Sequence, residues 1–515
     1  MRLPVSGSLT HAGARLPAGI LTKSNRCVTV ICGSVPGRAG DTPSCVITLD
    51  GGHLTSSDIA LLAAPGATVE VAAQARHRVA ESHDFAEQVS TQRAVYGRTT
   101  GVGANRTDAV ADPARHALGL LRSHATSAGP LRSAERVRAM LVVRLNQLAA
   151  GGSGASPALL DGLVAMLNAD ALPLVREFGS IGTGDLSALA TTALALGGEG
   201  ATSVPLPLFV AFGTHDALPF MSSNAATIGD SALAVVALRG YADAAMVVAA
   251  LTFAAIDGND EAFGETMERT TPFPGARAVA RRMRGLVGGL GPAARLQDPF
   301  SLRAIPQVHG AFLDALDRLD QVVTAMANAP AENPVIVPGV GIAHHGGFHG
   351  AYLAQALDAM ASALAQSAQL TFARCCLLND PALTTLPAFL GDGTPGASGA
   401  MVVEYVAASA LATLRSLAAP AAVQSVSISR GVEDDASFAS LAATQAHAAF
   451  EGYRTLLGCE LVVAVRAVRM RGVAFAPDSP LRAALATCAD LDASVADRDL
   501  TDDLAVAETL LDLLR

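Results

Sequence analysis

Long stretches of this chain carry hydrophobic residues at helical spacing. The clearest one starts at Ser133, a typical helix N-cap residue, and stops at Gly151. Between them, apolar residues recur every three or four positions: Val137, Met140, Leu141, Leu145 and Leu148. Similar patterns run from Gln307 to about Asn328 and from about His349 to Asn379. Helices of this length reach about 45 Å and pack side by side, so the pattern predicts an all-α fold built as a long-helix bundle.

Few segments have the pattern of β-strands. Short runs of β-branched residues with turn-forming neighbours occur at four places: Cys27–Cys32, Cys45–Leu49, Thr68–Ala72 and Val335–Val337. Most of them precede the long helices. We therefore expect a small mixed part near the N-terminus beside the helical bundle.

The composition of the chain limits the kinds of partner that it can bind. The chain has 515 residues, of which half are hydrophobic, and 46 acidic against 36 basic side chains, a net charge of −10. The acidic residues are dispersed, which disfavours nucleic acid as a partner. The longest apolar run, Ala244–Ile256, is interrupted only by Thr252 and is shorter than the ~20 residues of a membrane-spanning helix. Seven scattered cysteines and the lack of a signal-like segment in residues 1–40 favour a cytoplasmic protein.

A glycine-rich loop at Tyr96–Gly103 is a candidate for chemistry. It places one of only five tyrosines in flexible polar backbone. A nearby cation such as Arg98 would lower the pKa of Tyr96 and make it a general base. The alternative is a tyrosine ring that merely packs the loop.

A second glycine-rich loop, Gly179–Asp185, runs directly into the predicted helix Leu186–Leu196. A tight loop at a helix N-terminus is electropositive and suits an anion or an electrophile. By itself this signal is weak, because Asp185 could simply cap the helix.

Ordered motifs along residues 46–450 resemble those of the histidine/phenylalanine ammonia-lyase superfamily. The family's Tyr-Gly-x-x-Thr-Gly-x-Gly loop is similar to Tyr96–Gly103, and its Gly-Ser-x-Gly-Ala-Ser-Gly-Asp-Leu segment resembles 179–186. Four further segments match in order: Ser123-His124-Ala125, Asn224, Gln297-Asp298-Pro299-Phe300-Ser301-Leu302-Arg303, and Gly346-Gly347-Phe348-His349-Gly350. Glu433-Asp434 resembles the middle of the family's Gln-Glu-Asp-His, with Val432 and Asp435 replacing the outer pair.

The resemblance implies a fold of the ammonia-lyase/fumarase-like type, assembled as a homotetramer whose active sites draw on several subunits. It further implies four parts: an N-terminal extension, an active-site domain, a central bundle and a C-terminal helical region, at 1–45, 46–220, 221–450 and 451–515. Tyr96 would remove a β-proton, and Arg303 would bind the substrate carboxylate. Asn224 and Gln297 would orient the substrate, while His124, Glu433 and Phe348 would line its ring side. Arg98 could bind a second acidic group.

One departure from the family concerns its electrophile, a methylidene-imidazolone that forms from Ala-Ser-Gly. The corresponding residues here are Gly182-Thr183-Gly184, followed by Asp185, and the segment is one residue short. Thr183 could dehydrate, but a methyl group would then crowd the reactive carbon. Phe300 also replaces a tyrosine that the family uses near this group. We therefore expect no cofactor; the alternative is an imidazolone built on Thr183.

The expected chemistry changes accordingly. The imidazolone reacts with the lone pair of a free amine, and a quaternary ammonium has none. The sequence thus predicts a carbon–nitrogen lyase that eliminates ammonia or trimethylamine from an amino acid or betaine with an imidazole-like or aromatic ring. This is similar to ergothionase, a branch of the family that eliminates trimethylamine from a thiolated histidine betaine.

Three alternatives remain open at this stage. An aminomutase or cyclase would use the same base and carboxylate site to add an amine to an unsaturated acid. A noncatalytic relative would keep only the fold. The cluster His344, His345 and His349 could bind a metal, although Gly346-Gly347 disfavours the helix that such spacing needs.

Overall fold

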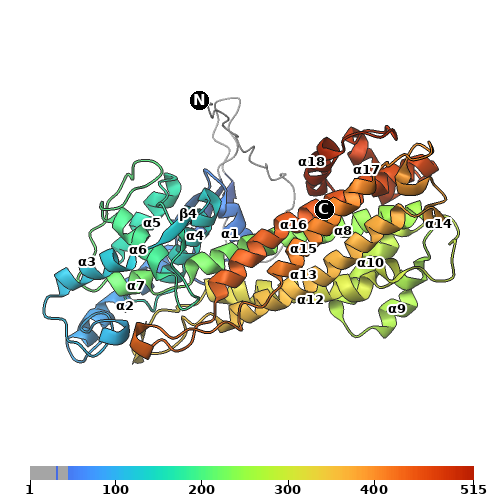
Figure 1. Cartoon of the computed structure of the whole chain (residues 1–515). Coiled ribbons are helices and arrows are strands. Elements are labelled where there is room, and N and C mark those ends of the chain that lie inside the picture. Colours follow the sequence, from blue (N-terminus) through green and yellow to red (C-terminus); the bar gives the residue numbers. More distant parts are fainter. Residues whose placement is uncertain (1–29, 33–44) are drawn as a thin grey trace, which may run out of the picture.

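The structure is a computed structural model that describes residues 30–32 and 45–515. Long helices form a central bundle, and smaller helices and short strands gather at one end of it (Figure 1). The bundle consists of α8 (Ala225–Ala255), α12 (Ile305–Ala327), α13 (Ala351–Leu378), α15 (Met401–Leu417) and α16 (Ala439–Arg471). The predicted all-α, long-helix fold is confirmed.

The smaller end of the molecule holds the helices that precede the bundle. They are α1 (Ser56–Ala63), α2 (Ala73–Ser90), α3 (Pro113–His124), α4 (Ala134–Ala149), α5 (Ala158–Asn168), α6 (Leu186–Leu196) and α7 (Ala217–Met221). Ser133 caps α4 by accepting a hydrogen bond from the Arg136 backbone N–H. The prediction of helices from the apolar spacing is confirmed for α4, α6, α12 and α13, whose ends fall within about two residues of the expected positions.

Short strands form three small sheets in the described residues. The first has the order β1 (Val30–Cys32), β2 (Cys45–Leu49) and β3 (Thr68–Val71); β1 and β2 run antiparallel, and β2 and β3 run parallel. The others pair β4 (Ala128–Leu131) with β5 (Arg176–Phe178), and β6 (Val335–Val337) with β7 (Gly341–Ala343). Strands β2, β3 and β6 confirm the prediction. Strands β4, β5 and β7 were missed because they lack a run of β-branched residues.

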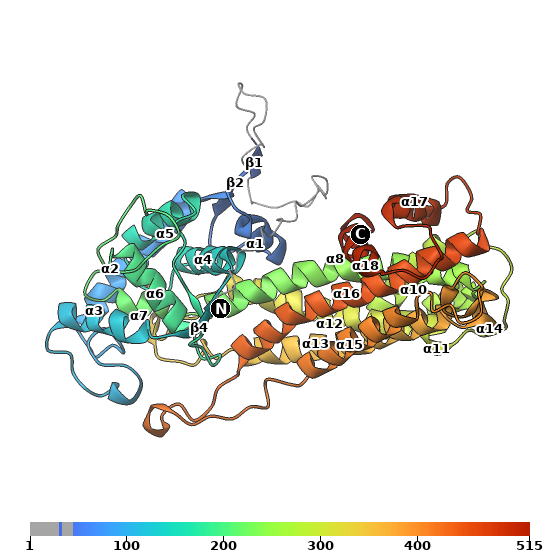
Figure 2. The same ribbon diagram turned by 45° about the horizontal axis from the view of Figure 1, so that its top comes forward.

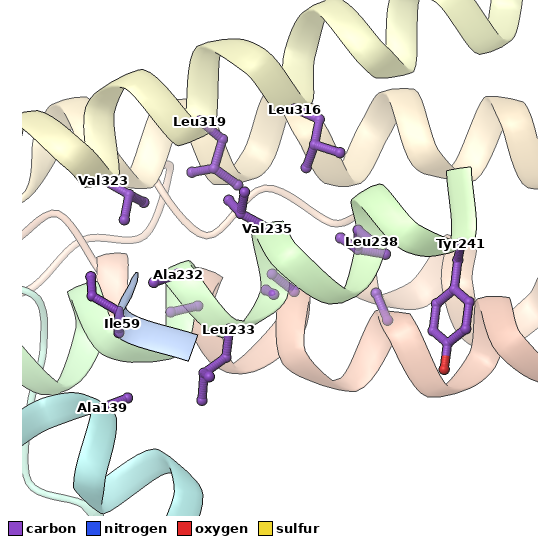
Figure 3. Close-up of a cluster of buried hydrophobic side chains, with 14 of the residues drawn as sticks. Ile59, Ala139, Ala232, Leu233, Val235, Leu238, Tyr241, Leu316, Leu319 and Val323 are labelled. Carbon is purple, nitrogen blue, oxygen red and sulfur yellow. The ribbon is translucent and has the colours of Figure 1, made fainter. Parts of the chain in front are cut away.

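Helix α8 is the central element of the core. Figure 3 shows its residues Val235 and Leu238 facing Leu316 and Leu319 of α12, while Ala139 of α4 lies beside its first turns. The helical stretch Ala217–Ala255 is long and apolar enough to cross a membrane, yet 72% of its most apolar window is buried inside the protein. A helix that is apolar on all sides is typical of such a core position.

Short helices pack along the part of the bundle away from the smaller end, and the C-terminal segment lies beside its middle (Figure 2). These are α9 (Glu265–Thr270), α10 (Pro274–Val287), α11 (Phe300–Arg303), α14 (Pro381–Thr384), α17 (Pro480–Thr487) and α18 (Thr501–Leu510). The expected N-terminal extension, residues 1–45, lies outside the described residues except for β1 and residue 45. The division at 220 and 450 stays a prediction; α16 continues through residue 450 as one helix.

Candidate active site

The loop Gly179–Asp185 lies where the N-termini of four helices meet. The Gly350 N–H at the start of α13 donates to the Gly182 carbonyl (3.1 Å), and the Phe438 N–H at the start of α16 donates to the Ile181 carbonyl (2.9 Å). Asp185 precedes α6, and its own N–H donates to the Ser223 carbonyl just before α8 (2.7 Å). Helix N-termini carry partial positive charge, so this loop is a site for an anion or for an electron-rich group.

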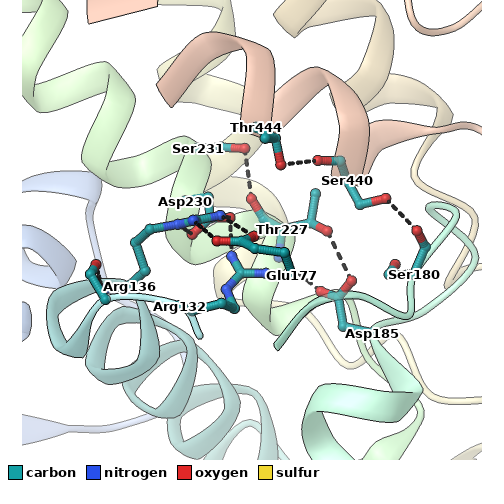
Figure 4. Close-up of polar contacts among 11 residues, drawn as sticks. Arg132, Arg136, Glu177, Ser180, Asp185, Thr227, Asp230, Ser231, Ser440 and Thr444 are labelled. Carbon is teal, nitrogen blue, oxygen red and sulfur yellow. Dashed lines mark hydrogen bonds and ion pairs between the residues drawn. The ribbon is translucent and has the colours of Figure 1, made fainter. Parts of the chain in front are cut away.

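Asp185 holds this loop against α8. Figure 4 shows its carboxylate accepting hydrogen bonds from the Thr227 backbone N–H (2.8 Å) and hydroxyl (2.9 Å). Its side chain makes no capping bond to α6. Burial raises the pKa of Asp185, although the hydrogen bonds from Thr227 act in the opposite direction. Asp185 therefore positions the loop, and Thr183 is the residue that the loop presents outward.

A cavity of about 710 Å³ opens over Thr183. The predicted residues Tyr96, Thr183, Phe348 and Glu433 all line it, although they come from four separate segments of the chain. Asn224 lies directly behind this wall, because its side-chain amide donates to the Phe348 carbonyl. Its Oδ1 is buried and has no hydrogen-bond partner among the described residues. The cavity thus brings together the predicted base Tyr96, the predicted ring-binding residues Phe348 and Glu433, and the glycine-rich loop at Thr183.

Tyr96 is half-buried at the edge of this cavity. Its hydroxyl oxygen accepts a hydrogen bond from the Gly103 N–H at the other end of the same loop (2.8 Å). Burial raises the pKa of Tyr96, and the Glu433 carboxylate raises it further, whereas the Gly103 N–H and Arg106 lower it. The expected lowering of this pKa by Arg98 is wrong; the cation that acts on Tyr96 is Arg106.

Arg98 points away from the cavity. Its side chain is only 1% exposed, and its guanidinium donates to Glu87 (3.2 Å) and to the Gly154 carbonyl (2.6 Å). A cation enclosed in this way has no free face for a substrate. The expectation that Arg98 binds a second acidic group of the substrate is corrected: Arg98 is a structural cation behind the loop.

Several cavity residues were not predicted as site residues. Arg106, Thr107, Asn333 and Asp434 line the cavity beside Tyr96 and Glu433. Asp435, which the sequence already suggested as a group that could stabilise a cationic substrate, lines it as well. In the sequence, Asp434 could have been found from the departure from the family pattern at residue 435. Arg106 could have been found from its position just after Gly103. A cavity wall with adjacent carboxylates and one exposed guanidinium suits a substrate that carries both signs of charge.

The three histidines of the open metal alternative have separate partners. His344 Nε2 accepts from the Tyr96 backbone N–H (3.2 Å), and His345 Nε2 lies 2.7 Å from the Glu332 carbonyl. His349 Nε2 lies 3.2 Å from the Asp435 carboxylate. In the part of the chain that the structure describes, no group of three or more His, Cys, Asp or Glu side chains could hold a metal ion. The histidines instead support the loops around the cavity.

His124 lies outside this cavity. It ends α3, where its Nδ1 is 2.9 Å from the Leu120 carbonyl and 3.1 Å from the Ser123 hydroxyl. It borders a separate shallow depression whose wall includes Gly101 and Val102. The Tyr96–Gly103 loop therefore separates His124 from Glu433, and within one chain these two residues do not share a substrate.

Gln297, Phe300 and Arg303 lie still farther away. They line a different cavity of about 480 Å³, and α11 packs against the end of α13 near Arg374, which donates to the Ser301 carbonyl (3.1 Å). From Gly350 to Arg374 the helix rises about 36 Å at 1.5 Å per residue. Figure 2 shows α11 near the opposite end of the bundle from α6 and α7. One chain alone does not combine Arg303 with Tyr96.

Arg303 is nevertheless poised for an anion. Its guanidinium stacks over the Phe300 ring at 4.4 Å, and Phe300 is 69% exposed. Arg303 Nε is buried without a hydrogen-bond partner among the described residues. Stacking on an aromatic ring orients a guanidinium without using its outer N–H groups. These groups stay available to a carboxylate.

The glycine loop does not fit the family's imidazolone. That group needs a residue between 182 and 184 that loses water to leave a bare methylene, and Thr183 would keep a methyl group there. The serine of the loop is Ser180, whose hydroxyl accepts from the Gly182 N–H (3.3 Å) and donates to the Gly184 carbonyl (3.3 Å). Ser180 shapes the turn, and Ile181 follows it. The residues of this loop therefore do not fit the imidazolone.

Comparison with known proteins places this chain in a family. The family model described as aromatic amino acid lyase matches residues 54–490. The histidine ammonia-lyase of Symbiobacterium thermophilum is 34% identical over 82% of this chain and 88% of its own length. The tyrosine aminomutase of Streptomyces globisporus superposes with a TM-score of 0.84 at 28% identity, covering 91% of this chain and 97% of the other.

A further solved structure supports the fold alone. The ergothionase of Treponema denticola has a TM-score of 0.85 at 23% identity and covers 91% of this chain and 99% of its own. Fold, cavity and relatives together define the class of this protein: it is a carbon–nitrogen lyase on a long-helix bundle. The chain belongs to the aromatic amino acid lyase family.

Proposed function

We propose that this lyase eliminates ammonia or trimethylamine from an amino acid or betaine with an imidazole-like or aromatic ring, without a methylidene-imidazolone. The observation that carries the proposal is the cavity in which Tyr96 and Glu433 face a glycine loop that presents Thr183 in place of a serine. The base is retained there, and the residue needed for the electrophile is not. A permanently cationic amine is the leaving group that fits such a site.

The elimination itself needs a base and an acceptor of charge. The phenolate oxygen of Tyr96 takes a proton from the β-carbon, and the released electron pair forms the double bond to the α-carbon. The C–N bond breaks in the same step, and its electron pair leaves with the nitrogen, so that a quaternary ammonium departs as a neutral amine. The Gly103 N–H, 2.8 Å from the phenol oxygen, stabilises the phenolate.

The complete site, in this proposal, joins more than one copy of the chain. Arg303 and Gln297 of another copy would bind the substrate carboxylate at the cavity of the first, as in the homotetramer that the family resemblance implies. The separation of about 36 Å along α13 within one chain supports this arrangement. We place the enzyme in the cytoplasm, with a small-molecule substrate.

An aminomutase is the second candidate. The likeness to a tyrosine aminomutase at 28% identity favours this candidate. An aminomutase also begins by eliminating the amine, and it then returns the amine to the neighbouring carbon of the same substrate. The products discriminate the two functions: a lyase releases an unsaturated acid, whereas an aminomutase releases a β-amino acid.

The test combines an intact mass with a release assay. We expect the purified chain to have its unmodified mass, and we expect faster amine release from histidine betaine than from histidine, because ammonia is the poorer leaving group without an imidazolone. Tyr96→Phe should lower kcat by roughly 10²- to 10⁴-fold, the usual contribution of a general base. Loss of two waters from the mass, with release of ammonia from histidine, would restore an imidazolone built on Thr183 and overturn the proposal.

A further inference from the structure

We infer that Arg98 is a positioning residue that anchors the Tyr96–Gly103 loop from behind and so fixes the Tyr96 hydroxyl at the cavity. The inference rests on the proposed role of Tyr96 as base. Arg98 itself is not among the residues that line the cavity.

The backbone sends the two side chains in opposite directions. Between them, Gly97 has a φ of +69°, and an added Cβ would stand 2.1 Å from Leu218 Cδ2. A side chain at this position is excluded both by the left-handed backbone and by α7. The turn therefore commits the Tyr96 ring to the cavity and the Arg98 guanidinium to the interior.

The guanidinium binds two other segments of the chain directly and a third through Glu87. It donates to Glu87 on α2 (3.2 Å) and to the carbonyls of Gly154 (2.6 Å) and Ser153 (3.5 Å) after α4. Glu87 in turn lies 3.0 Å from Nδ1 of His215, just before α7. The loop is thus tied through one side chain to α2, to the turn after α4 and to the segment before α7.

The fit around Arg98 is close. Gly154 has a φ of +68°, and a Cβ there would stand 2.6 Å from Arg98 Nη2. Any larger residue would displace the guanidinium. Burying a cation is costly unless it is paired. The outer nitrogens of Arg98, which is 1% exposed, have Glu87 and two carbonyls as partners, whereas its buried Nε has none among the described residues.

The hydroxyl of Tyr96 depends on this anchor through the loop. It accepts from the Gly103 N–H, and the neighbouring Ala104 N–H donates to the Ser429 hydroxyl (3.1 Å). Both ends of the loop are therefore held at the cavity, and Arg98 holds its middle. Release of the middle would let the Tyr96 oxygen move relative to the substrate carbon, and small displacements of this kind are costly to kcat.

The experiment compares Arg98→Met with Arg138→Met. Arg138 is the matched control, since it is also 1% exposed and binds the carbonyls of Leu62 (3.1 Å) and Leu167 (2.9 Å), yet it lies outside the cavity wall. Glu87→Gln, which keeps Arg98 but removes its charged partner, serves if Arg98→Met does not fold. The wild type and each variant are labelled with 3-fluorotyrosine, and the ¹⁹F resonance that Tyr96→Phe removes is that of Tyr96.

We expect Arg98→Met and Glu87→Gln to broaden or split the Tyr96 resonance and to lower the pKa of Tyr96 toward its ordinary value, because the ring becomes less buried. On histidine betaine, kcat should fall at least about tenfold more than for Arg138→Met at a similar loss of Tm, with KM little changed. Arg98→Lys, which keeps the positive charge, should restore part of the sharp Tyr96 resonance.

Two results would overturn the inference. One is a Tyr96 resonance that stays sharp with an unmoved pKa in both variants. The other is an equal loss of kcat in Arg98→Met and Arg138→Met. The fluorine readout needs no turnover, so it still tests the anchor if histidine betaine is not a substrate, whereas activity retained in Tyr96→Phe would refute the proposed base alone.

Discussion

Glu433 lies close enough to Tyr96 for its carboxylate to act on the ionisation of the phenol. A Cβ added at Gly103, whose N–H binds the Tyr96 oxygen, would stand 3.6 Å from Glu433 Oε1. The carboxylate therefore opposes ionisation of the phenol, while the Gly103 N–H favours it. Burial is the largest influence, and together with the carboxylate it holds the pKa of Tyr96 above its ordinary value.

Glu433→Gln should shift the pH profile of the enzyme. Burial and the Glu433 charge both raise the pKa of Tyr96, so removal of the charge lowers it, and the phenolate forms at lower pH. We expect the acid limb of kcat/KM, measured on histidine betaine, to move to lower pH, because this limb reports the free enzyme.

Asp434→Asn is the control for this change. Asp434 lines the same cavity and loses the same charge, but it is not among the groups that shift the pKa of Tyr96. Its profile should stay close to that of the wild type. An acid limb that does not move in Glu433→Gln, or that moves equally in both variants, would contradict the assignment of Tyr96 as the titrating base.

At the scale of elements, a buried ion network joins the small end of the molecule to the bundle. Figure 4 shows Asp230 of α8 between Arg132 and Arg136, and Arg136 also reaches Glu177 of β5. Asp230 is 1% exposed. Burial raises the pKa of Asp230, but the two arginines outweigh it and hold the pKa below its ordinary value. Thr227, which binds Asp185, lies one turn earlier on the same helix.

Asp230→Asn should lower the free energy of unfolding by about 3 kcal/mol, because it leaves two largely buried guanidinium groups without their carboxylate. Since the folded-state pKa is depressed, this stabilisation is present above the unfolded-state pKa and is lost as the pH falls through the folded-state pKa. Urea unfolding should therefore show a gap between the wild type and the variant that is full at neutral pH and closes below about pH 4.

Asp161→Asn provides the comparison. Its partner Arg76 lies 2.5 Å away, but both side chains are exposed, and such pairs contribute about 0 to 1 kcal/mol. Equal effects of the two substitutions, or a gap that widens in acid, would show that the Asp230 network does not stabilise this junction.

At the scale of the whole molecule, the two halves of the proposed site lie near opposite ends of each chain. Tyr96→Phe and Arg303→Gln should each be inactive as pure proteins. When the two are co-expressed, some cavities would combine an intact Tyr96 with an intact Arg303 from another copy. We expect the mixed oligomers to regain part of the wild-type kcat on histidine betaine.

The matched mixture is Tyr96→Phe with Asn224→Ala. Both residues belong to the same cavity of one chain, so every cavity in that mixture carries a defect and activity should not return. If neither mixture recovers activity while pure subunits still assemble, the site does not form between copies and Arg303 has another role.

The sequence by itself determined the helices and the family of this protein. Apolar residues at a spacing of three to four positions specify α4, α12 and α13 locally. The ordered motifs from Tyr96 to Glu433 are short contiguous segments, so they can be recognised without the structure. The same motifs showed that Thr183 stands where the family has a serine. Strands β4 and β5 escaped prediction because their pairing is not local.

Only the tertiary structure decided which of these residues meet. The direction of a side chain in a glycine-rich loop depends on backbone dihedrals and on what packs behind it, and neither is written in the local sequence. For this reason Arg98 was assigned to the substrate although it is buried against Glu87, and Arg106 was overlooked. The long bundle likewise set Arg303 about 36 Å from the cavity along α13, a separation that follows from helix length and packing rather than from any motif.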